Sequence, residues 1–293
     1  RRIVVTHGVV RDMDRLRACH TDAFFMTTDP NEVTDHPDVD IVVELIGGLE
    51  VAREVVWCSL ANGKHVVTAN KALIAEHGNE IFALARDQGL TVAFEAAVAG
   101  GISIIKVLRE GLAGNRINRV AGIINGTSNY ILTDMLENDV DFSESLKAAQ
   151  RLGYAESDPA FDIEGTDAAH KLAILASIAY GIPLKFDQVY IEGITNVTSE
   201  DIGYATELGY RVKHLGLAIR KDARGVQPGF AEQLPGIAER HREMASLIPA
   251  MAPPSLASVG DKLVDVDHQE ETAISETCIG VSCCTRSTQR PRK

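Results

Sequence analysis

The sequence has no apolar run of membrane-spanning length and no cysteine pattern typical of a disulfide framework. No stretch of about 20 consecutive apolar residues occurs among its 293 residues, and its five cysteines are odd in number and concentrated late in the chain. Cysteines in this pattern do not make a disulfide framework, so we expect a protein of the reducing cytoplasm, and the lack of a long apolar run predicts no membrane partner. The net charge of −12 argues against binding to nucleic acid or to anionic membranes.

The sequence also lacks the G-x-G-x-x-G motif that opens most dinucleotide-binding folds. In such folds this motif joins the first strand to a helix whose N-terminus holds the pyrophosphate. Other parts of the sequence nevertheless indicate a nucleotide-binding sheet. We therefore expect an N-terminally truncated sequence that is without its main phosphate-binding loop.

The first hundred residues show a strand–helix–strand rhythm. Residues 2–10, 40–45 and 65–68 are strand-like, and a helix is expected over 50–62. The run at 40–45 is almost continuously apolar, which is typical of a parallel strand buried on both faces. Gly47 and Gly48 follow it directly, so a ligand could approach the backbone closely there, although an ordinary tight turn explains the pair equally well.

Five carboxylates and a lysine are concentrated in the segment GYAESDPAFDIEGTDAAHK, residues 153–171. A helix is expected from Thr166, a plausible N-cap, to Gly181, and Lys171 lies on a face of it that is otherwise apolar. Burial lowers the pKa of a lysine and nearby carboxylates raise it, so Lys171 is either a fixed cation or a tuned proton donor. The alternative is an exposed ion pair between Asp167 and Lys171, four residues apart, which would stabilise the helix only slightly.

The same segment resembles the signature of the homoserine dehydrogenases. The residues that carry the resemblance are Ala149, Gly153, Tyr154, Ala155, Asp158, Pro159, Asp162, Ile163, Gly165, Asp167 and Lys171. The resemblance implies that Lys171 exchanges a proton with the substrate oxygen during hydride transfer. It also implies that Glu156 and Asp167 hold the amino and hydroxyl end of homoserine, that Asp162 is a further acid of the pocket, and that Gly153 lies against the cofactor.

The N-terminal third extends this resemblance. Asn70-Lys71 matches a family turn whose lysine lies beside the nicotinamide and the substrate, so Lys71 is expected to assist catalysis, whereas a surface lysine is the simpler alternative. Gly47 and Arg11 would contact the cofactor. Because an arginine can pair with a 2′-phosphate, Arg11 favours NADP over NAD.

A structural sodium ion is the second expected cofactor. The segment EAAVAGGIS is rich in small residues and contains one carboxylate, a composition that usually only turns the chain. In the family a similar segment binds sodium, which implies ligands at Glu95 and at the carbonyls of Val98, Gly100 and Ile102. The segment NGTSNY, residues 125–130, also matches a family element near the substrate, and by itself it predicts a helix-capping turn.

These observations predict an α/β protein with a partial doubly wound, Rossmann-like parallel sheet domain over residues 1–97. A second α+β domain for catalysis and dimerisation is expected over 98–222, and a homodimer or higher homo-oligomer follows from the family. The resemblance ends near residue 220. Residues 223–293 contain several prolines and little periodicity, so we expect a divergent, poorly ordered tail. Its three cysteines are not accompanied by a second cluster of zinc ligands.

The leading hypothesis is an NAD(P)-dependent oxidoreductase that interconverts L-aspartate 4-semialdehyde and L-homoserine in threonine, methionine and isoleucine biosynthesis. The sequence is also compatible with the dehydrogenase part of a longer kinase fusion. Two alternatives remain open. One is a truncated or frame-disrupted fragment that binds homoserine or dimerises without turnover. The other is a different amino acid dehydrogenase of related architecture.

Overall fold

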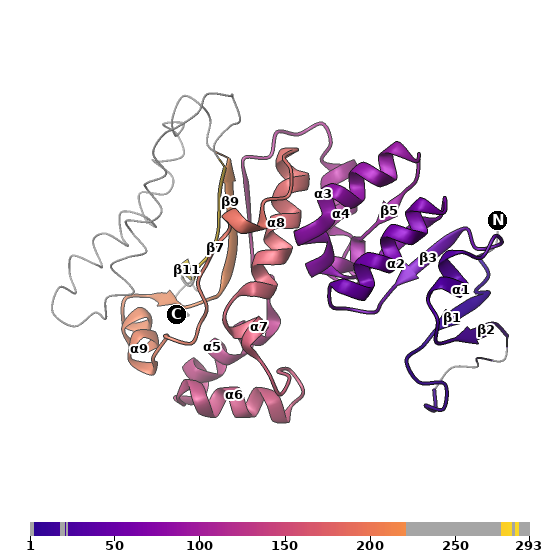
Figure 1. Cartoon of the computed structure of the whole chain (residues 1–293). Helices are drawn as coiled ribbons and strands as arrows, with labels where there is room; N and C mark the ends of the chain where they lie inside the picture. The colour runs from indigo at the N-terminus through magenta and orange to yellow at the C-terminus, as the bar shows by residue number, and fades with distance from the viewer. Residues whose placement is uncertain (1–2, 18–20, 22, 221–276, 283–284, 287–293) are drawn as a thin grey trace.

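The structure is a computed structural model that describes residues 3–17, 21, 23–220, 277–282 and 285–286. Figure 1 shows two halves that meet at α3 (Lys71–Asp87) and α8 (Thr166–Tyr180), which pack side by side near the centre. Parallel strand pairs form the N-terminal half, and a mixed sheet with a group of helices forms the C-terminal half. The chain is a mixed α/β protein, as the sequence predicts.

Strands and helices alternate in the N-terminal half from β2 onward. In chain order they are β1 (His7–Val9), β2 (Phe25–Thr27), α1 (Asn31–Thr34), β3 (Ile41–Glu44), α2 (Glu50–Ala61), β4 (His65–Thr68), α3 and β5 (Val92–Ala93). Strands β3, β4 and β5 form a parallel sheet in that order, and β1 and β2 form a separate parallel pair. Strand β1 is shorter than the predicted strand over residues 2–10, whereas β3, α2 and β4 lie where the sequence predicts them.

Only one face of the β3–β4–β5 sheet is covered by helices of the described chain. Val66 packs with Val56 of α2 and Ile74 of α3 in one apolar cluster, whereas Val43 is 58% exposed on the opposite face. The expectation that residues 40–45 are buried on both faces is therefore wrong in this structure. A continuous apolar run predicts a strand, but it carries no information about whether a second layer packs against it.

The C-terminal half combines a four-stranded mixed sheet with α8 and a group of helices below it (Figure 1). Its elements are β6 (Arg119–Gly122), α5 (Gly126–Asn138), α6 (Phe142–Arg151), α7 (Ala160–Ile163), α8, β7 (Tyr190–Ile191), α9 (Ser199–Glu207), β8 (Tyr210–Arg211), β9 (Leu215–Arg220), β10 (Thr277–Ser282) and β11 (Thr285–Arg286). The strand order is β6-β9-β10-β7, with β9 antiparallel to both neighbours and β10 parallel to β7. Helix α8 packs against this sheet through Leu172 and Ala176.

Two short strands lie within the segment that was expected to be a poorly ordered tail. The backbone of β10 pairs with β9 and β7, and β11 pairs with β8. The expectation is therefore wrong for residues 277–282 and 285–286. Backbone pairing with two neighbouring strands requires no apolar periodicity, which was the signal that the sequence lacked. The rest of the expected tail beyond residue 222 lies outside the described residues.

Helix α8 begins and ends at glycines. Its N-cap is Gly165 at φ +91°, not Thr166 as expected, and a Cβ there would lie 3.2 Å from the Glu192 carbonyl oxygen. Its C-cap is Gly181 at φ +66°, as predicted. Although α8 is rich in apolar residues, no helix in the described part of the chain is long and apolar enough to cross a membrane.

One apolar cluster joins the two halves. It contains Leu73 and Ile74 of α3 together with Ile174 and Leu175 of α8. The segments that connect the halves, after β5, contain a short 3-10 helix (Glu95–Ala97), the short helix α4 (Ile104–Lys106) and a single π-helical turn (Val107–Gly111). The packing of α3 on α8 fixes the N-terminus of α3 beside the N-terminal turns of α8.

Candidate active site

A cavity of about 390 Å³ lies where the first turns of α5, α7 and α8 meet. Helix N-termini present unpaired backbone N–H groups and a partial positive charge, so this junction suits anionic and polar groups. The lining residues are Asn125, Gly126, Thr127, Tyr130, Tyr154, Asp162, Asp167 and Lys171. Two acids of the α7–α8 segment, Asp162 and Asp167, and its lysine, Lys171, therefore line the cavity.

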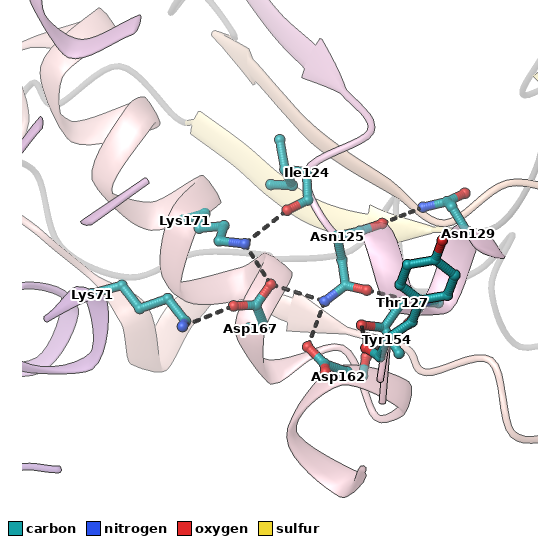
Figure 2. A network of polar contacts seen from close by, with 10 residues as sticks. Lys71, Ile124, Asn125, Thr127, Asn129, Tyr154, Asp162, Asp167 and Lys171 are labelled. Atoms are coloured by element: carbon teal, nitrogen blue, oxygen red, sulfur yellow. Dashed lines mark hydrogen bonds and ion pairs between the residues drawn. The ribbon is translucent and has the colours of Figure 1, made fainter. Parts of the chain in front are cut away.

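Asp167 is the centre of a cluster of charges beside this cavity (Figure 2). Its Oδ1 accepts the Lys71 Nζ at 3.1 Å, and its Oδ2 accepts the Lys171 Nζ at 2.7 Å and the Asn125 Nδ2 at 2.9 Å. Asp167 is only 3% exposed. Two ammonium groups and one amide thus compensate a buried carboxylate.

Opposing effects determine the pKa of Asp167. Burial alone raises the pKa, but the hydrogen bond and charge of Lys171, the hydrogen bond from Asn125 and the charge of Lys71 together lower it below 3.8. Asp167 is consequently ionised at neutral pH. It supplies a fixed negative charge between two lysines and does not act as an acid.

Lys171 lies on the second turn of α8 and points toward the cavity (Figure 2). Its Nζ donates to the Ile124 carbonyl oxygen at 3.0 Å as well as to Asp167. An ammonium group has three donors, so one remains available for a group in the cavity. The ion pair between Lys171 and Asp167 that the sequence allowed is present, but its side chains are 18% and 5% exposed, unlike those of a surface pair.

Lys71 reaches the same carboxylate from the other half of the chain. It is the first residue of α3, and the N-cap Asn70 accepts from the Leu73 N–H. The Lys71 Nζ lies 5.2 Å from the centre of the Phe161 ring, which also favours a cation there. The surface alternative for Lys71 is wrong, because the structure places it beside Asp167.

The remaining predicted substrate residues are only partly brought together. Asp162 on α7 accepts the Asn125 Nδ2 at 2.7 Å and lines the cavity. Glu156 is exposed, is not among the lining residues, and its side chain has no hydrogen bond or ion pair with any described residue. Gly153 occupies a turn after α6 at φ +76°. The backbone carbonyl oxygen of the next residue, Tyr154, accepts the Thr127 hydroxyl.

A buried carboxylate organises the turns at the carboxyl ends of β3 and β4. Glu44 is 1% exposed, and its Oε1 accepts the N–H groups of Ile46 at 2.7 Å and Gly47 at 3.3 Å. Its Oε2 accepts the Thr68 hydroxyl at 2.5 Å. Because Asn70 donates to the Gly48 carbonyl oxygen at 2.7 Å, the glycine turn and the turn that carries Lys71 are tied together. The carboxyl end of a parallel sheet is where nucleotides bind.

Arg11 lines a second cavity, of about 480 Å³, directly after β1. Arg15 and Arg17 share this cavity, and the Arg17 guanidinium donates to the carbonyl oxygens of Arg15 and Asp12. Three arginines around one cavity make a site suited to an anion such as a phosphate.

Glu95, the predicted sodium ligand, contacts the start of a short helix. Its Oε1 and Oε2 accept the N–H groups of Ile105 at 2.8 Å and Lys106 at 3.0 Å. The carbonyl oxygen of Ile102 accepts the Ile104 N–H. No group of three or more His, Cys, Asp or Glu side chains that could hold a metal occurs among the described residues. Carboxylate and carbonyl oxygens retain further lone pairs, so these contacts are compatible with a cation.

Family models match both halves of the chain. A model described as homoserine dehydrogenase matches residues 104–274, and a model described as homoserine dehydrogenase, NAD binding domain, matches residues 3–95. The chain belongs to the homoserine dehydrogenase family. The first match extends past residue 220, where the resemblance seen in the sequence ended. The N-terminal half is accordingly an NAD-binding, Rossmann-like domain, and the chain is related to oxidoreductases.

Individual homoserine dehydrogenases agree with the family models. The chain is 62% identical over 205 residues to the homoserine dehydrogenase of Pseudomonas aeruginosa, covering 70% of this chain and 47% of that protein. It is similar to the crystal structure of a homoserine dehydrogenase from Thiobacillus denitrificans, with 60% identity, a TM-score of 0.72, and coverage of 74% and 50%. A hyperthermophilic archaeal homoserine dehydrogenase in complex with NADPH is 27% identical, with a TM-score of 0.57 and coverage of 70% and 69%. The chain spans about half the length of its curated bacterial relatives.

Sequence reasoning missed the contacts of two residues in the candidate site and at the sheet edge. The sequence places Asn125 in a capping turn and, through the family resemblance, near the substrate, but it does not predict that the Asn125 amide bridges Asp162 and Asp167. Glu44 was read as part of an apolar strand, although it joins the turns at the sheet edge. A single carboxylate in an otherwise apolar strand is itself a signal, because a charge is rarely buried without partners.

His170 is expected to make the folded chain less stable in acid. It is 2% exposed between Phe161 and Phe186, and its ring nitrogens have no hydrogen-bond partner in the described structure. Burial and the charge of Lys71 lower its pKa to about 4, against the smaller effect of Asp167. The Glu76 carboxylate, at 3.6 Å, is the nearest acid.

The pKa of His170 in the folded chain lies below the value of 6.5 for a free histidine, so the unfolded chain takes up a proton more readily than the folded chain. The contribution of the neutral ring to stability is therefore fully present above about pH 6.5. This contribution, of about 3 kcal/mol, is expected to be lost as the pH falls from 6.5 to about 4. The variant His170→Phe should lose less stability over this range, as measured by urea unfolding at a series of pH values. Equal losses of stability in the variant and the wild type would show that His170 is not the source of this acid sensitivity.

Proposed function

We propose that the chain carries the active site of a homoserine dehydrogenase that interconverts L-aspartate 4-semialdehyde and L-homoserine. The observation that supports this most directly is the convergence of Lys71 and Lys171 on Asp167 at the wall of a polar cavity. Two lysines beside a carbonyl oxygen stabilise the negative charge that develops on it during reduction. The family membership supports the same reaction.

The chain's own residues would bind the substrate and move one proton. Lys171 has a donor directed to neither Asp167 nor Ile124, and this donor would protonate the substrate oxygen as the alcohol forms. Lys71 would stabilise the same oxygen. Asp162, with Glu156 brought closer by the substrate, would hold the ammonium group, and Asp167 would fix both lysines. A bound nicotinamide cofactor supplies the hydride.

Turnover by the purified chain tests this proposal. We expect NADPH-dependent reduction of aspartate semialdehyde and oxidation of homoserine at alkaline pH, both followed by NADPH absorbance. Saturable binding of NADPH should be measured in parallel by fluorescence. The absence of both binding and turnover would favour the inactive-fragment alternative, even though the family membership would stand.

We propose NADP as the preferred cofactor, held by Gly47, Lys71, Gly153 and Arg11. The arginine-lined cavity after β1 supports a 2′-phosphate there, and the archaeal relative was solved with NADPH. A sodium ion held by Glu95 and the carbonyls of Val98, Gly100 and Ile102 would stiffen the linker between the halves. The domain limits at residues 97 and 222, a homodimer and a cytoplasmic location stay predictions.

The variant Arg11→Ala tests the cofactor preference. Loss of a charge-assisted hydrogen bond of about 1.5–3 kcal/mol corresponds to a Kd for NADPH that is roughly ten- to a hundredfold higher. The Kd for NADH, which has no 2′-phosphate, should change little and serves as the internal control. Equal weakening of both cofactors would mean that Arg11 contributes only to the fold.

A further inference from the structure

Asn125 has an unusual combination of hydrogen bonds at the start of α5. It is 2% exposed and is the N-cap of this helix, where its Oδ1 accepts the Ser128 N–H at 2.8 Å. Because the amide oxygen must face that N–H group, the amide nitrogen must face the opposite side. The cap thus determines the orientation of the whole side chain.

Both donors of this amide are directed at carboxylates, as Figure 2 shows. The Asn125 Nδ2 lies 2.7 Å from Asp162 Oδ1 and 2.9 Å from Asp167 Oδ2. The two acids come from different helices, α7 and α8, and carboxylates this close repel one another. The Asn125 amide is neutral and has two donors, so it allows the two carboxylates to lie side by side. The two lysines pair with Asp167 and not with Asp162.

Other helices of the chain show that capping does not require an amide. The N-cap of α6 is Asp141, and that of α9 is Thr198, and each accepts a backbone N–H through an oxygen. Asparagine and aspartate are about equally good N-caps. Capping therefore explains the oxygen of Asn125 but leaves its two donors unexplained.

We propose that Asn125 is a positioning residue of the active site, which holds Asp162 and Asp167 in fixed and separate roles. Asp167 is kept between the two lysines. The second oxygen of Asp162, which has no hydrogen-bond partner within the described chain, is kept toward the cavity for the ammonium group of an amino acid substrate. The part of this inference that concerns substrate rests on the proposed function.

Asn125→Asp separates the two uses of the side chain. The variant retains an oxygen for the Ser128 N–H but replaces the two donors by a further acceptor, between two carboxylates. Three adjacent carboxylates should share a proton, so at least one of their pKa values should rise. The other titratable or charged groups around the position are Lys71, Lys171, Tyr130, Tyr154, His170 and His214.

A raised pKa in the folded state means that the folded variant binds a proton that the unfolded chain releases. The stability of Asn125→Asp should therefore approach that of the wild type at about pH 5 and fall behind as the pH rises. We expect the Tm deficit at about pH 8 to exceed that at about pH 5 by about 3 °C or more. A role confined to capping gives the same deficit at both pH values.

Asp141→Asn is the matched control, because it makes the reverse exchange at an exposed N-cap far from the cavity. The N–H of Glu144 and the Ser143 hydroxyl lower the pKa of Asp141 below 3.8. Its charge is therefore constant between about pH 5 and about pH 8, and the control should keep one Tm offset across that range. A pH-dependent offset in the control as large as in Asn125→Asp would overturn the proposal.

The affinity for homoserine, measured by calorimetry with NADPH present, which cannot oxidise homoserine, provides the second readout. We expect Asn125→Asp to weaken it at least about tenfold at pH 8, because Asp162 loses the hydrogen bond that holds its second oxygen toward the cavity, and a hydrogen bond to a charged group contributes about 1.5–3 kcal/mol. A change within about twofold, or a Tm profile parallel to that of the wild type, would overturn the role of Asn125. If the wild type binds no homoserine, the proposed function fails, and the Tm profiles alone decide whether Asn125 separates the two acids.

Discussion

Replacement of Lys171 by alanine is expected to lower kcat for homoserine oxidation by about a thousandfold, within the range of roughly 10²–10⁴ typical of a general acid or base. The Lys171 Nζ is held by Asp167 and by the Ile124 carbonyl oxygen, which leaves one donor for the cavity. Alanine removes the group that exchanges the proton but leaves the cavity and α8 in place. Steady-state kinetics with homoserine and NADP measure the effect.

Two further variants separate proton transfer from charge. Lys171→Arg keeps a cation but cannot give up a proton at accessible pH, so it should remain nearly as inactive as the alanine variant. Lys106→Ala removes an exposed lysine that pairs with Glu110, and it should keep wild-type turnover. If Lys171→Ala retained more than about a tenth of wild-type kcat, a different amino acid dehydrogenase would become the better reading.

The variant Asp167→Asn is expected to lose both stability and activity. Its carboxylate is 3% exposed and compensates two ammonium groups, so the variant leaves two cations close together without their anion. Breaking a buried ion pair on one side costs about 3–5 kcal/mol, and we expect the lower end because the Lys71 side chain is 32% exposed. We expect kcat to fall about a hundredfold or more, because the lysines lose their fixed positions.

The pH dependence distinguishes this loss from a simple packing defect. The folded pKa of Asp167 is lowered, so its charge stabilises the fold above the unfolded value of about 3.9, and this contribution disappears as the pH falls through the folded pKa. The stability difference between the wild type and Asp167→Asn should thus be constant near neutral pH and shrink in acid. Glu80→Gln removes one partner of the exposed Arg53–Glu80 pair and should cost no more than about 1 kcal/mol.

The sequence predicted the elements whose signals are local. Helix α8 ends at Gly181 and has an apolar face, and β3 and β4 are short apolar runs with a helix between them. The acids and lysines of the site were also predicted, because the family signature names them. The contact between Lys71 and Asp167 could not be derived from spacing, since it depends on how α3 packs against α8.

Local sequence patterns do not reveal the additional contacts of a residue whose presence one role already explains. The cap at Asn125 explained that residue sufficiently, so its donors to two acids gave no separate signal. Glu44 lies in an otherwise apolar strand, and its apolar neighbours predict only a buried strand, not the contacts of the carboxylate. The exposed side of that strand was missed for a related reason, because exposure depends on what packs against the sheet rather than on the strand itself.

The packing of α3 on α8 has a consequence for how the chain unfolds. Leu73 and Ile174 share one apolar cluster, and Asn79 of α3 exchanges two hydrogen bonds with the backbone of Leu184. The two halves are thus in direct contact through α3 and α8, and we expect amide hydrogens of these two helices to exchange through a common opening. A ligand that binds only at the lysine–aspartate cluster should then protect both helices, because its binding stabilises the closed state and lowers the population of that shared open state.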